Sequence, residues 1–302
     1  LTSEVEQINI SSSSFDLTWT TDVVGDSEVE WGVTPDLGTT DSDFFLATDH
    51  LISLSGLSPG TLYYARVRST SDEGETVISP TRVYATISES SGNIHVYFTG
   101  SVDTTVAIDE EAMSLGTSTN DTIAAWITSA QHTLDIAVYN TNNVAIENAV
   151  NTAAANGVQI RYIAEGENAN LGIQNFDSSI PVHYRTDGEG SGMHNKFFVG
   201  DADYPETAFV LTGSTNMTTA NLNTDKNNVI VFQDQSIARG YRLEFNEMWG
   251  SDSMVPNEAN SKFGPAKTVN TPLKYIVGGS PVEVYFSPTD GTTSAIRETI
   301  ES

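Results

Sequence analysis

Residues 133–165 read TLDIAVYNTNNVAIENAVNTAAANGVQIRYIAE and predict the fold class of the larger part of the chain. The two ends of this stretch, residues 133–139 and 158–165, are almost continuous apolar runs of the length typical of buried strands. Between them, residues 143–157 place apolar side chains at helical spacing and finish at Gly157, a residue type that often ends a helix. A strand, a helix and a strand in this order predict a sheet that contains parallel strands and is covered by helices on both faces.

The same alternation continues on both sides of this stretch. Residues 93–99 are expected to form a strand, and residues 121–130 a helix with Asn120 or Asp121 at its start. Downstream, further strands are expected at HNKFFVGD, AFVLTGS and NNVIVFQ, followed by a helix over residues 235–251. The fold class predicted for residues 93–251 is therefore α/β, with a mixed sheet between helices.

The N-terminal residues 1–88 follow a different pattern. SFDLTWT (14–20) and SEVEWGV (27–33) alternate apolar and polar side chains, which predicts a small antiparallel sandwich. The run LSGLSPGTLYYARVRS resembles fibronectin type III domains and the N-terminal domain of purple acid phosphatases. The resemblance implies that Tyr63 is a corner tyrosine. Residues 89–92 are expected to be a linker.

The C-terminal part contains a partial repeat. Residues 252–281 are rich in Pro and Gly, and we expect a connecting loop there. Residues 282–302, VEVYFSPTDGTTSAIRETIES, repeat the Val-Tyr-Phe of residues 96–98, and Ile296 and Ile300 match Ile123 and Ile127. We interpret 282–302 as the beginning of a second, incomplete repeat, so that the rest comes from a missing C-terminal part or from a partner.

Composition narrows the classes of function. The chain has 302 residues, 40 of them acidic and 13 basic, for a formal charge of −27. Such a surface repels polyanions, which disfavours a nucleic-acid partner. There is no cysteine, so disulfides and thiolate metal sites are excluded, and no apolar run reaches the length of a membrane span. The composition and a start without Met suit a processed, secreted bacterial-type protein, and the acidic excess suits a saline setting.

The stretch MHNKFFVGD, residues 193–201, carries the candidate chemistry. In an extended strand His194 and Lys196 project on one side, about 7 Å apart. A lysine there can neutralise a phosphate oxygen while the imidazole attacks phosphorus. The run GSTN follows the next strand and can offer the Ser214 hydroxyl and the Asn216 amide to the same anion.

The pattern His194-x-Lys196-x4-Asp201, followed by Gly213-Ser214-x-Asn216, resembles the HKD signature of the phospholipase D superfamily, over about residues 93–302. The resemblance implies that His194 forms a covalent phosphohistidine and that Lys196 and Asn216 hold the phosphate oxygens, with Ser214 as a supporting donor. It implies no required cofactor or metal; bound calcium is compatible with the acidic surface but not implied. A second histidine, from a second repeat or a homodimer partner, would protonate the leaving group.

Two positions, Asp201 and Asn227, are not interpreted as groups that contact the phosphate. Asp201 lies seven residues past His194, about 23 Å along a continuous strand, so we interpret it as a structural residue. Many superfamily members have an acidic residue downstream of G-S-x-N that orients a catalytic histidine, but Asn227 stands there in this chain. Asp225 or an acid from elsewhere could take that role.

The other polar candidates are expected to be structural or solvated. The histidines are His95, His132 and His183. Arg185 and the loop 186–192 could border the mouth of the site. Glu165 and Glu167 could line the cleft or bind a cation, although a solvated turn is favoured. Glu244 and Glu247 are expected on the wet face of their helix.

Three functions are weighed. The first is a phosphodiesterase that hydrolyses or transphosphatidylates phospholipids, a lipid-degrading enzyme for which a peripheral membrane surface is a suitable partner. The second is a nuclease of the same superfamily, which would need a basic track for the nucleic-acid backbone. The third is a non-catalytic binding or scaffold protein with a degenerate half-site.

Overall fold

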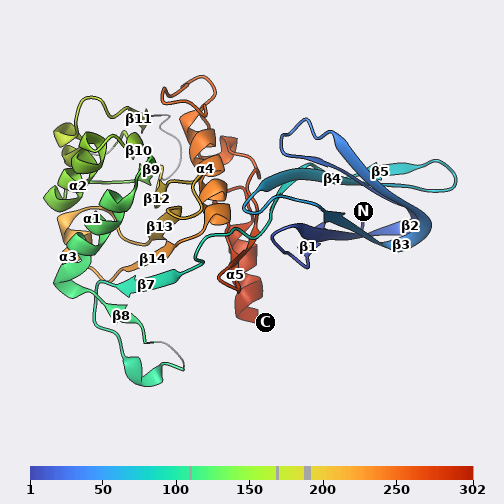
Figure 1. Ribbon diagram of the computed structural model, residues 1–302, viewed down its shortest axis with the longest axis horizontal. Coiled ribbons are helices and arrows are strands. Elements are labelled where there is room, and N and C mark those ends of the chain that lie inside the picture. The colour runs from blue at the N-terminus through green and yellow to red at the C-terminus, as the bar shows by residue number, and fades with distance from the viewer. Residues whose placement is uncertain (109–110, 168–169, 187–191, 302) are drawn as a thin grey trace. The chain divides into compact units, whose positions relative to one another are not determined.

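The computed structural model describes residues 1–108, 111–167, 170–186 and 192–301. The chain divides into two compact units (Figure 1). The first contains residues 1–89 and 269–285, and the second contains residues 90–268 and 286–302. Within the described ranges, no helix is both long enough and apolar enough to cross a membrane.

The first unit is built from antiparallel strands around one core. Its strands are β1 (Glu6–Ile8), β2 (Ser14–Gly32), β3 (Thr39–Ser55), β4 (Leu62–Thr70), β5 (Thr76–Ile78) and β6 (Arg82–Ala85). The long strand β2 contributes Trp19 from its first half and Val29 from its second half to the same core, so the sheet folds over on itself. The Tyr63 hydroxyl accepts a hydrogen bond from Ser58 N at 2.8 Å, the bond that a corner tyrosine makes. The predicted strand-rich N-terminal region is confirmed, while its kinship with fibronectin type III domains stays a prediction.

The expectation of a plain connecting loop at 252–281 is wrong for its last part. Residues 274–277 form β15 (Lys274–Val277), which pairs with β16 (Ser280–Glu283) in an antiparallel hairpin of the first unit. Gly278 and Gly279, both at positive φ, form the tight turn that lets the backbone of β16 hydrogen-bond to the neighbouring β15. Residues 284–286 then leave the hairpin without forming the strand that the repeat predicted.

A helix does form where the repeat predicted one. It is α5 (Thr292–Glu301), and Ile296 and Ile300 on it are exposed. The second repeat itself stays a prediction.

The second unit is a mixed α/β layer structure, as predicted. Its strands are β7 (Ile94–Phe98), β8 (Met113–Ser114), β9 (Thr133–Val138), β10 (Gln159–Glu165), β11 (Val182–Arg185), β12 (Lys196–Gly200), β13 (Phe209–Gly213) and β14 (Asn228–Phe232). They lie in the order β11-β10-β9-β12-β13-β14-β7-β8. The strands from β11 to β9 run parallel, and each pairing from β9 through β12, β13 and β14 to β7 is antiparallel.

Helices cover both faces of this sheet (Figure 1). One face carries α1 (Thr119–Ser129), α2 (Val144–Ala155) and α3 (Thr219–Asn223), and the other carries α4 (Gln235–Trp249). Short 3-10 turns are η1 (Thr104–Val106), η2 (Gly116–Ser118), η3 (Leu171–Asn175) and η4 (Gly264–Ala266). Local signals set the helix ends: Asn143 and Asp234 cap the starts of α2 and α4, and Gly250 ends α4 in the left-handed conformation.

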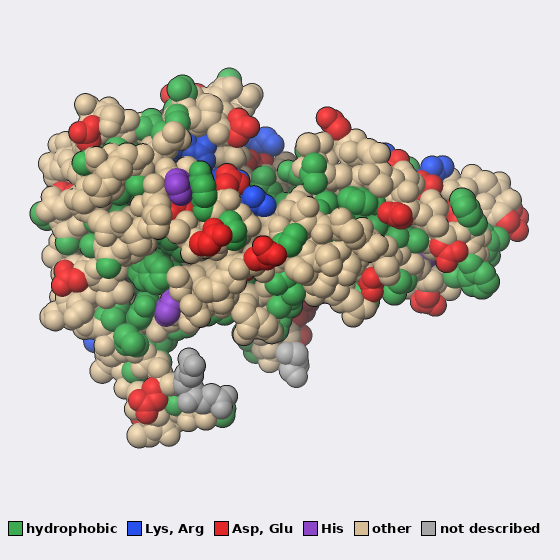
Figure 2. All heavy atoms as spheres, in the orientation of Figure 1, with side chains coloured by type: hydrophobic (Ala, Val, Ile, Leu, Met, Phe, Trp, Pro, Cys, Tyr) green, Lys and Arg blue, Asp and Glu red, His purple; other side chains and the backbone are tan. Residues whose placement is uncertain are grey.

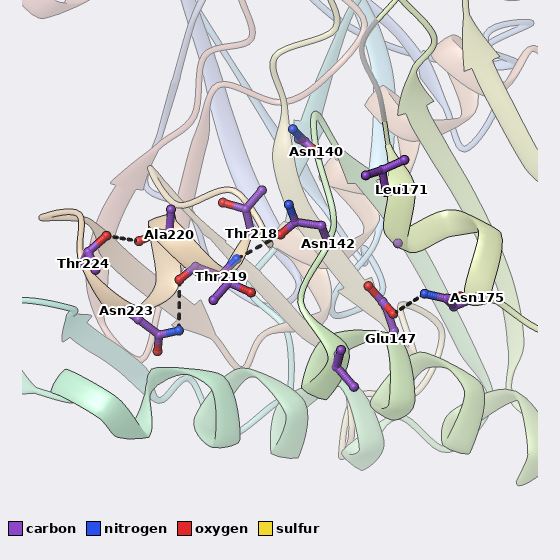
Figure 3. Close-up of a pocket in the computed structure, with 12 residues that line it drawn as sticks. Asn140, Asn142, Glu147, Leu171, Asn175, Thr218, Thr219, Ala220, Asn223 and Thr224 are labelled. Atoms are coloured by element: carbon purple, nitrogen blue, oxygen red, sulfur yellow. Dashed lines mark hydrogen bonds between the residues drawn. The ribbon is translucent and has the colours of Figure 1, made fainter.

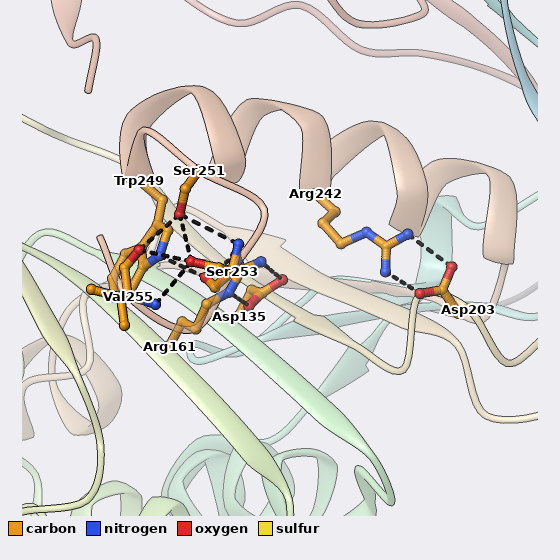
Figure 4. A network of polar contacts seen from close by, with 8 residues as sticks. All are labelled: Asp135, Arg161, Asp203, Arg242, Trp249, Ser251, Ser253 and Val255. Atoms are coloured by element: carbon orange, nitrogen blue, oxygen red, sulfur yellow. Dashed lines mark hydrogen bonds and ion pairs between the residues drawn. The ribbon is translucent and has the colours of Figure 1, made fainter. Parts of the chain in front are cut away.

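A buried ion pair joins the sheet to α4. Asp135 and Arg161 are register partners on β9 and β10, and the guanidinium binds both carboxylate oxygens at 2.6 and 2.7 Å (Figure 4). The same guanidinium lies 4.7 Å from the ring centroid of Phe245 and donates to Ser253 O. Both charges are therefore paired and hydrogen-bonded, which is what a buried ion pair needs.

The prediction that Glu244 lies on a wet helix face is wrong. The segment after α4 folds back over the helix, and Lys267 Nζ lies 2.5 Å from Glu244 Oε1, with both side chains buried. Burial raises the pKa of Glu244 to about 7. Glu247 is also covered, because it accepts bonds from Lys262 and Thr268 of the same segment.

We expect Glu244→Gln to lower the free energy of unfolding by about 3 kcal/mol above pH 7, because Lys267 is left as an uncompensated buried charge. Adding Lys267→Met should restore most of the loss. Denaturant titration measures both variants. The exposed pair Arg297–Glu301 provides the control, since Glu301→Gln should change nothing measurable. A Glu244→Gln chain as stable as the wild type would contradict the pairing.

Candidate active site

One edge of the second unit's sheet collects the residues of the motif. Strand β9 ends at Val138, which pairs with Lys196 at the start of β12. Because β12 is antiparallel to both β9 and β13, the end of β9, the start of β12 and the end of β13 lie at the same edge. This arrangement brings Tyr139, His194 and the loop 214–216 to one place.

His194 contacts Lys196, although the strand predicted over both residues begins only at Lys196 and His194 lies just before it. Lys196 is only 9% exposed; its Nζ donates to the His194 carbonyl at 2.8 Å and lies 3.3 Å from His194 Nδ1. An ammonium facing Nδ1 makes that nitrogen the acceptor, which leaves the proton of a neutral imidazole on Nε2. For Nε2 to act as a nucleophile, the lysine must turn toward a bound anion and let Nδ1 take the proton.

The pKa values of this pair suit work near neutral pH. Partial burial, reinforced by the charge of Lys196, lowers the pKa of His194 below its usual 6.5. Burial also lowers the pKa of Lys196 to about 8. Between these values the imidazole is neutral while the ammonium keeps its charge, which is the combination needed for a nucleophile beside an anion-binding group.

Tyr139 is a site residue that the sequence analysis missed. Its ring meets the His194 ring edge-on with centroids 4.8 Å apart, and Lys196 Nζ lies 5.6 Å from its centroid. Its N–H donates to Asn195 O at 3.0 Å, which continues the pairing of the two strands. The sequence contains a signal for this position, because Tyr139 is the last residue of the apolar run 133–139 and follows directly after β9.

The G-S-T-N loop is held by contacts with Asn227 and Asn228 around the start of β14. Gly213 has φ 146°, and a Cβ there would lie 2.3 Å from Asn228 O, so only glycine fits. Ser214 Oγ donates to Asn227 Oδ1 at 2.9 Å and accepts from Asn228 N. Asn216 Oδ1 is buried without a hydrogen-bond partner among the described residues.

Asn227 orients Ser214 and not His194. Its amide donates to Asn221 O, and its oxygen accepts from Ser214. The alternative acid, Asp225, binds the Asn221 amide with its carboxylate. Within the described part of the chain, no carboxylate is hydrogen-bonded to His194, so the orienting acid that the resemblance implies has no counterpart there.

Asp201 lies at the opposite edge of the sheet, at the far end of β12. It is fully buried, with φ 50°, and its carboxylate accepts the N–H groups of Gln131, His132 and Thr133 at 2.8 to 2.9 Å. These bonds hold the backbone as it enters β9. Asp201 therefore belongs to the fold.

Glu165 does not lie in the solvated turn that the sequence favoured. It is 1% exposed, and its Oε2 accepts from Met193 N at 2.6 Å and from Arg185 Nη1 at 3.4 Å. Arg185 is buried as well, so its charge pairs with Glu165. The pair fixes the backbone one residue before His194, whereas Glu167 is exposed. Most of the loop 186–192 lies outside the described residues.

The other four histidines are engaged elsewhere. His50 contacts Thr21 and Ser27, His95 contacts Gln233, His132 stacks on Tyr204, and His183 contacts Ser261. Burial lowers the pKa of His183, in keeping with its place between Trp249 and Phe263.

A separate cleft lies near this edge, between α2, η3 and α3 (Figure 3). Neutral side chains dominate its lining, among them Asn140, Asn142, Thr219 and Asn223, and its one charged group is Glu147. A cleft without a cation is unsuited to a phosphate. The candidate anion-binding groups are instead the Lys196 ammonium beside His194 and the side chains of Ser214 and Asn216 in the loop at the same edge. In the described ranges no group of three or more His, Asp and Glu is placed to hold a metal ion.

Comparison with known proteins finds relatives of the second unit. A family model described as cardiolipin synthase, PLD-like domain, matches residues 123–249. These residues form a phospholipase D-like domain. The mitochondrial cardiolipin hydrolase of Xenopus tropicalis is 29% identical over 122 residues, covering 40% of this chain and 56% of that protein. The enzyme of that name from Chlamydomonas reinhardtii is 27% identical over 126 residues, covering 41% and 54%.

This chain thus spans about half the length of the curated relatives it matches. Among solved structures, the phospholipase D family member Nuc from Salmonella typhimurium is similar, with 20% identity, a TM-score of 0.40, and coverage of 52% of this chain and 93% of that one. The family model agrees with the predicted superfamily over residues 123–249.

Asp201→Ala should lower the free energy of unfolding by about 3 kcal/mol, because three N–H groups lose a buried charged acceptor. Asp203→Asn, two residues further on, is the control: its carboxylate is half exposed and paired with Arg242, so the change should stay below about 1 kcal/mol. Chemical denaturation measures both. An Asp201→Ala chain with wild-type stability but no activity would instead place this carboxylate in the chemistry.

Proposed function

We propose that the phospholipase D-like domain carries one half of a phospholipid phosphodiesterase site, with His194 as the nucleophile. The observation that supports this most directly is the contact between His194 and the buried ammonium of Lys196 at the sheet edge. Asn216, whose amide nitrogen is a hydrogen-bond donor, lies in the loop at the same edge. These are a nucleophile and two groups able to hold phosphate oxygens.

In the proposed first step, His194 Nε2 attacks phosphorus. A P–N bond forms while the P–O bond to the leaving alcohol breaks, and Lys196 and Asn216 stabilise the charge on the non-bridging oxygens. In the second step, water or an alcohol gives its proton to a base and attacks phosphorus, and the P–N bond breaks so that the histidine is released. Water gives phosphatidate and a free headgroup, and an alcohol gives headgroup exchange. The proposed chemistry requires no metal ion.

The proposed site needs a general acid for natural substrates. An alkoxide leaving group must receive a proton as the P–O bond breaks. The other histidines of this chain have partners away from His194. We therefore propose that the proton comes from a second histidine, supplied by a second repeat or by a second copy of this chain.

Charge favours a lipid over a nucleic acid as substrate. Acidic residues outnumber basic ones about threefold over the whole chain, and acidic side chains are spread over the visible face of both units (Figure 2). A nucleic-acid backbone would need a track of cations. The relatives named cardiolipin hydrolases act, by that name, on a phospholipid. A nuclease and a non-catalytic scaffold are the alternatives that the following experiments separate.

His194→Ala should reduce hydrolysis of bis-p-nitrophenyl phosphate by about a thousandfold. This substrate releases a stable anion that needs no proton, so a single half-site suffices for the first step. His132→Ala is the matched control and should keep full activity, because that imidazole stacks on Tyr204. Activity should persist in EDTA. If His194→Ala cleaves this diester like the wild type, the catalytic proposal is wrong.

Natural substrates separate the remaining classes. Phosphatidylcholine, cardiolipin and a plasmid should be offered to the same chain at equal phosphate concentration. Where a second repeat or a second copy of the chain supplies the second histidine, we expect turnover of phospholipid and none of the plasmid. Cleavage of the plasmid alone would favour the nuclease, and inactivity toward every diester would favour the scaffold.

The pH profile of kcat/KM should rise with a pKa below 6.5, as His194 becomes neutral, and fall with a pKa of about 8, as Lys196 loses its proton. Lys196→Arg should keep the acid limb and move the alkaline limb upward, because a guanidinium stays protonated. An alkaline limb that does not move in Lys196→Arg would show that another group titrates there.

A further inference from the structure

The β2–β3 ribbon of the first unit contains two bulges side by side. The strands pair at Thr20↔Asp49, Gly25↔Ala47 and Ser27↔Asp43. Between the first two pairs, β2 supplies residues 21–24 against Thr48 alone. Between the second two, β3 supplies residues 44–46 against Asp26 alone. Each strand therefore bulges next to the same register pair, Gly25↔Ala47.

Five residues in the bulges are large, apolar and exposed. Phe44 is 80% exposed, Phe45 74% and Leu46 42%, while Val23 and Val24 on the other bulge are 50% and 47% exposed. Because both bulges adjoin the pair Gly25↔Ala47, these five side chains gather on one part of the sheet. We call them the bulge patch. Isolated exposed apolar residues are ordinary, but five exposed apolar side chains on both sides of one register pair, two of them aromatic, indicate an interaction surface.

The bulges are fixed by hydrogen bonds. Phe45 N donates to Asp43 Oδ1 at 2.9 Å, and Thr21 Oγ1 donates to Val23 O at 2.7 Å. Beneath them, the buried ring of His50 contacts Thr21 Oγ1 with Nε2 and Ser27 Oγ with Nδ1, each at 2.9 Å. The patch is therefore a preformed protrusion, and little conformational entropy is lost when it binds.

The charges around the patch select its partner. Asp22, Asp43 and Asp49 are exposed beside it. The nearby basic side chains Arg66 and Arg68 are already paired with Glu30 and Glu28. These exposed aspartates repel an anionic surface, and they also repel a second copy of the same acidic chain. They attract a surface whose outermost groups are cations.

We propose that the bulge patch docks the protein on a bilayer of zwitterionic phospholipid. In such a bilayer the quaternary ammonium groups lie outermost and can face the aspartates, while Phe44, Phe45 and Leu46 enter the boundary between headgroups and acyl chains. Aromatic side chains favour this boundary. The inference deepens the proposed function, because it names the surface that presents the substrate, but docking is measurable without turnover.

The test is co-sedimentation of the chain with phosphatidylcholine vesicles in EDTA. The partition coefficient of Phe44→Ser/Phe45→Ser should fall at least about tenfold relative to the wild type. Leu51→Ser is the matched control: Leu51 is 50% exposed on the same strand but outside both bulges, and its loss should leave partitioning unchanged. His194→Ala should bind as the wild type does, so a failed catalytic proposal leaves this test intact.

Several results would overturn the proposal. Wild-type chain that stays in solution, equal binding by the double serine variant, or binding only to phosphatidylglycerol vesicles would each do so. So would a wild-type dimer that the double serine variant abolishes in analytical ultracentrifugation, since the patch would then join two copies. Turnover of bis-p-nitrophenyl phosphate, which needs no surface, should be the same in all bulge variants.

Discussion

The carboxylate of Asp201 is the constraint on which the candidate site depends. It binds the backbone that enters β9 from a position at the end of β12. The two strands are neighbours, so these bonds fix where one begins relative to where the other stops. The register set there runs the length of both strands and decides that Val138 faces Lys196 at the far edge. Without it, the imidazole and the ammonium would have no fixed platform.

Buried charged side chains whose hydrogen bonds are formed hold the strands next to the site in place. The Asp135–Arg161 pair ties β9 to β10 and presents a flat guanidinium to the rings of α4. On the other side of the motif, Glu165 holds the backbone at Met193. Functional side chains that must keep a geometry are best supported by such fixed neighbours.

Local pattern was enough to predict much of this molecule. The alternation of strands and helices and the end at Gly157 follow from the period of the chain over a few residues, and the contact of His194 with Lys196 follows from their closeness in sequence. The prediction was wrong for Glu165 and Glu244 because the segments that bury them come from elsewhere in the sequence. Helical spacing puts Glu244 away from the sheet, but it cannot show that a later segment returns to cover it.

Pairing partners were the second kind of information that local pattern could not supply. Tyr139 contacts His194 only because β9 lies beside β12, and Ser214 meets Asn227 only because β13 lies beside β14. The hairpin at 274–283 is a similar case, since the sequence of its two short strands has the pattern of a loop and only their pairing makes them strands. The bulge patch required the register of two long strands before its residues could be grouped.

The placement of His194 and Asp201 at opposite edges of one sheet has a consequence for how the signature is read. Sites this far apart, with no shared partner, contribute to free energy independently. A descendant of this chain could lose the imidazole and keep a sound fold, or weaken the fold and keep the imidazole. The aspartate in an H-x-K-x4-D pattern thus indicates an intact strand to carry the site, which the chemistry needs, but it does not show that the imidazole is still present.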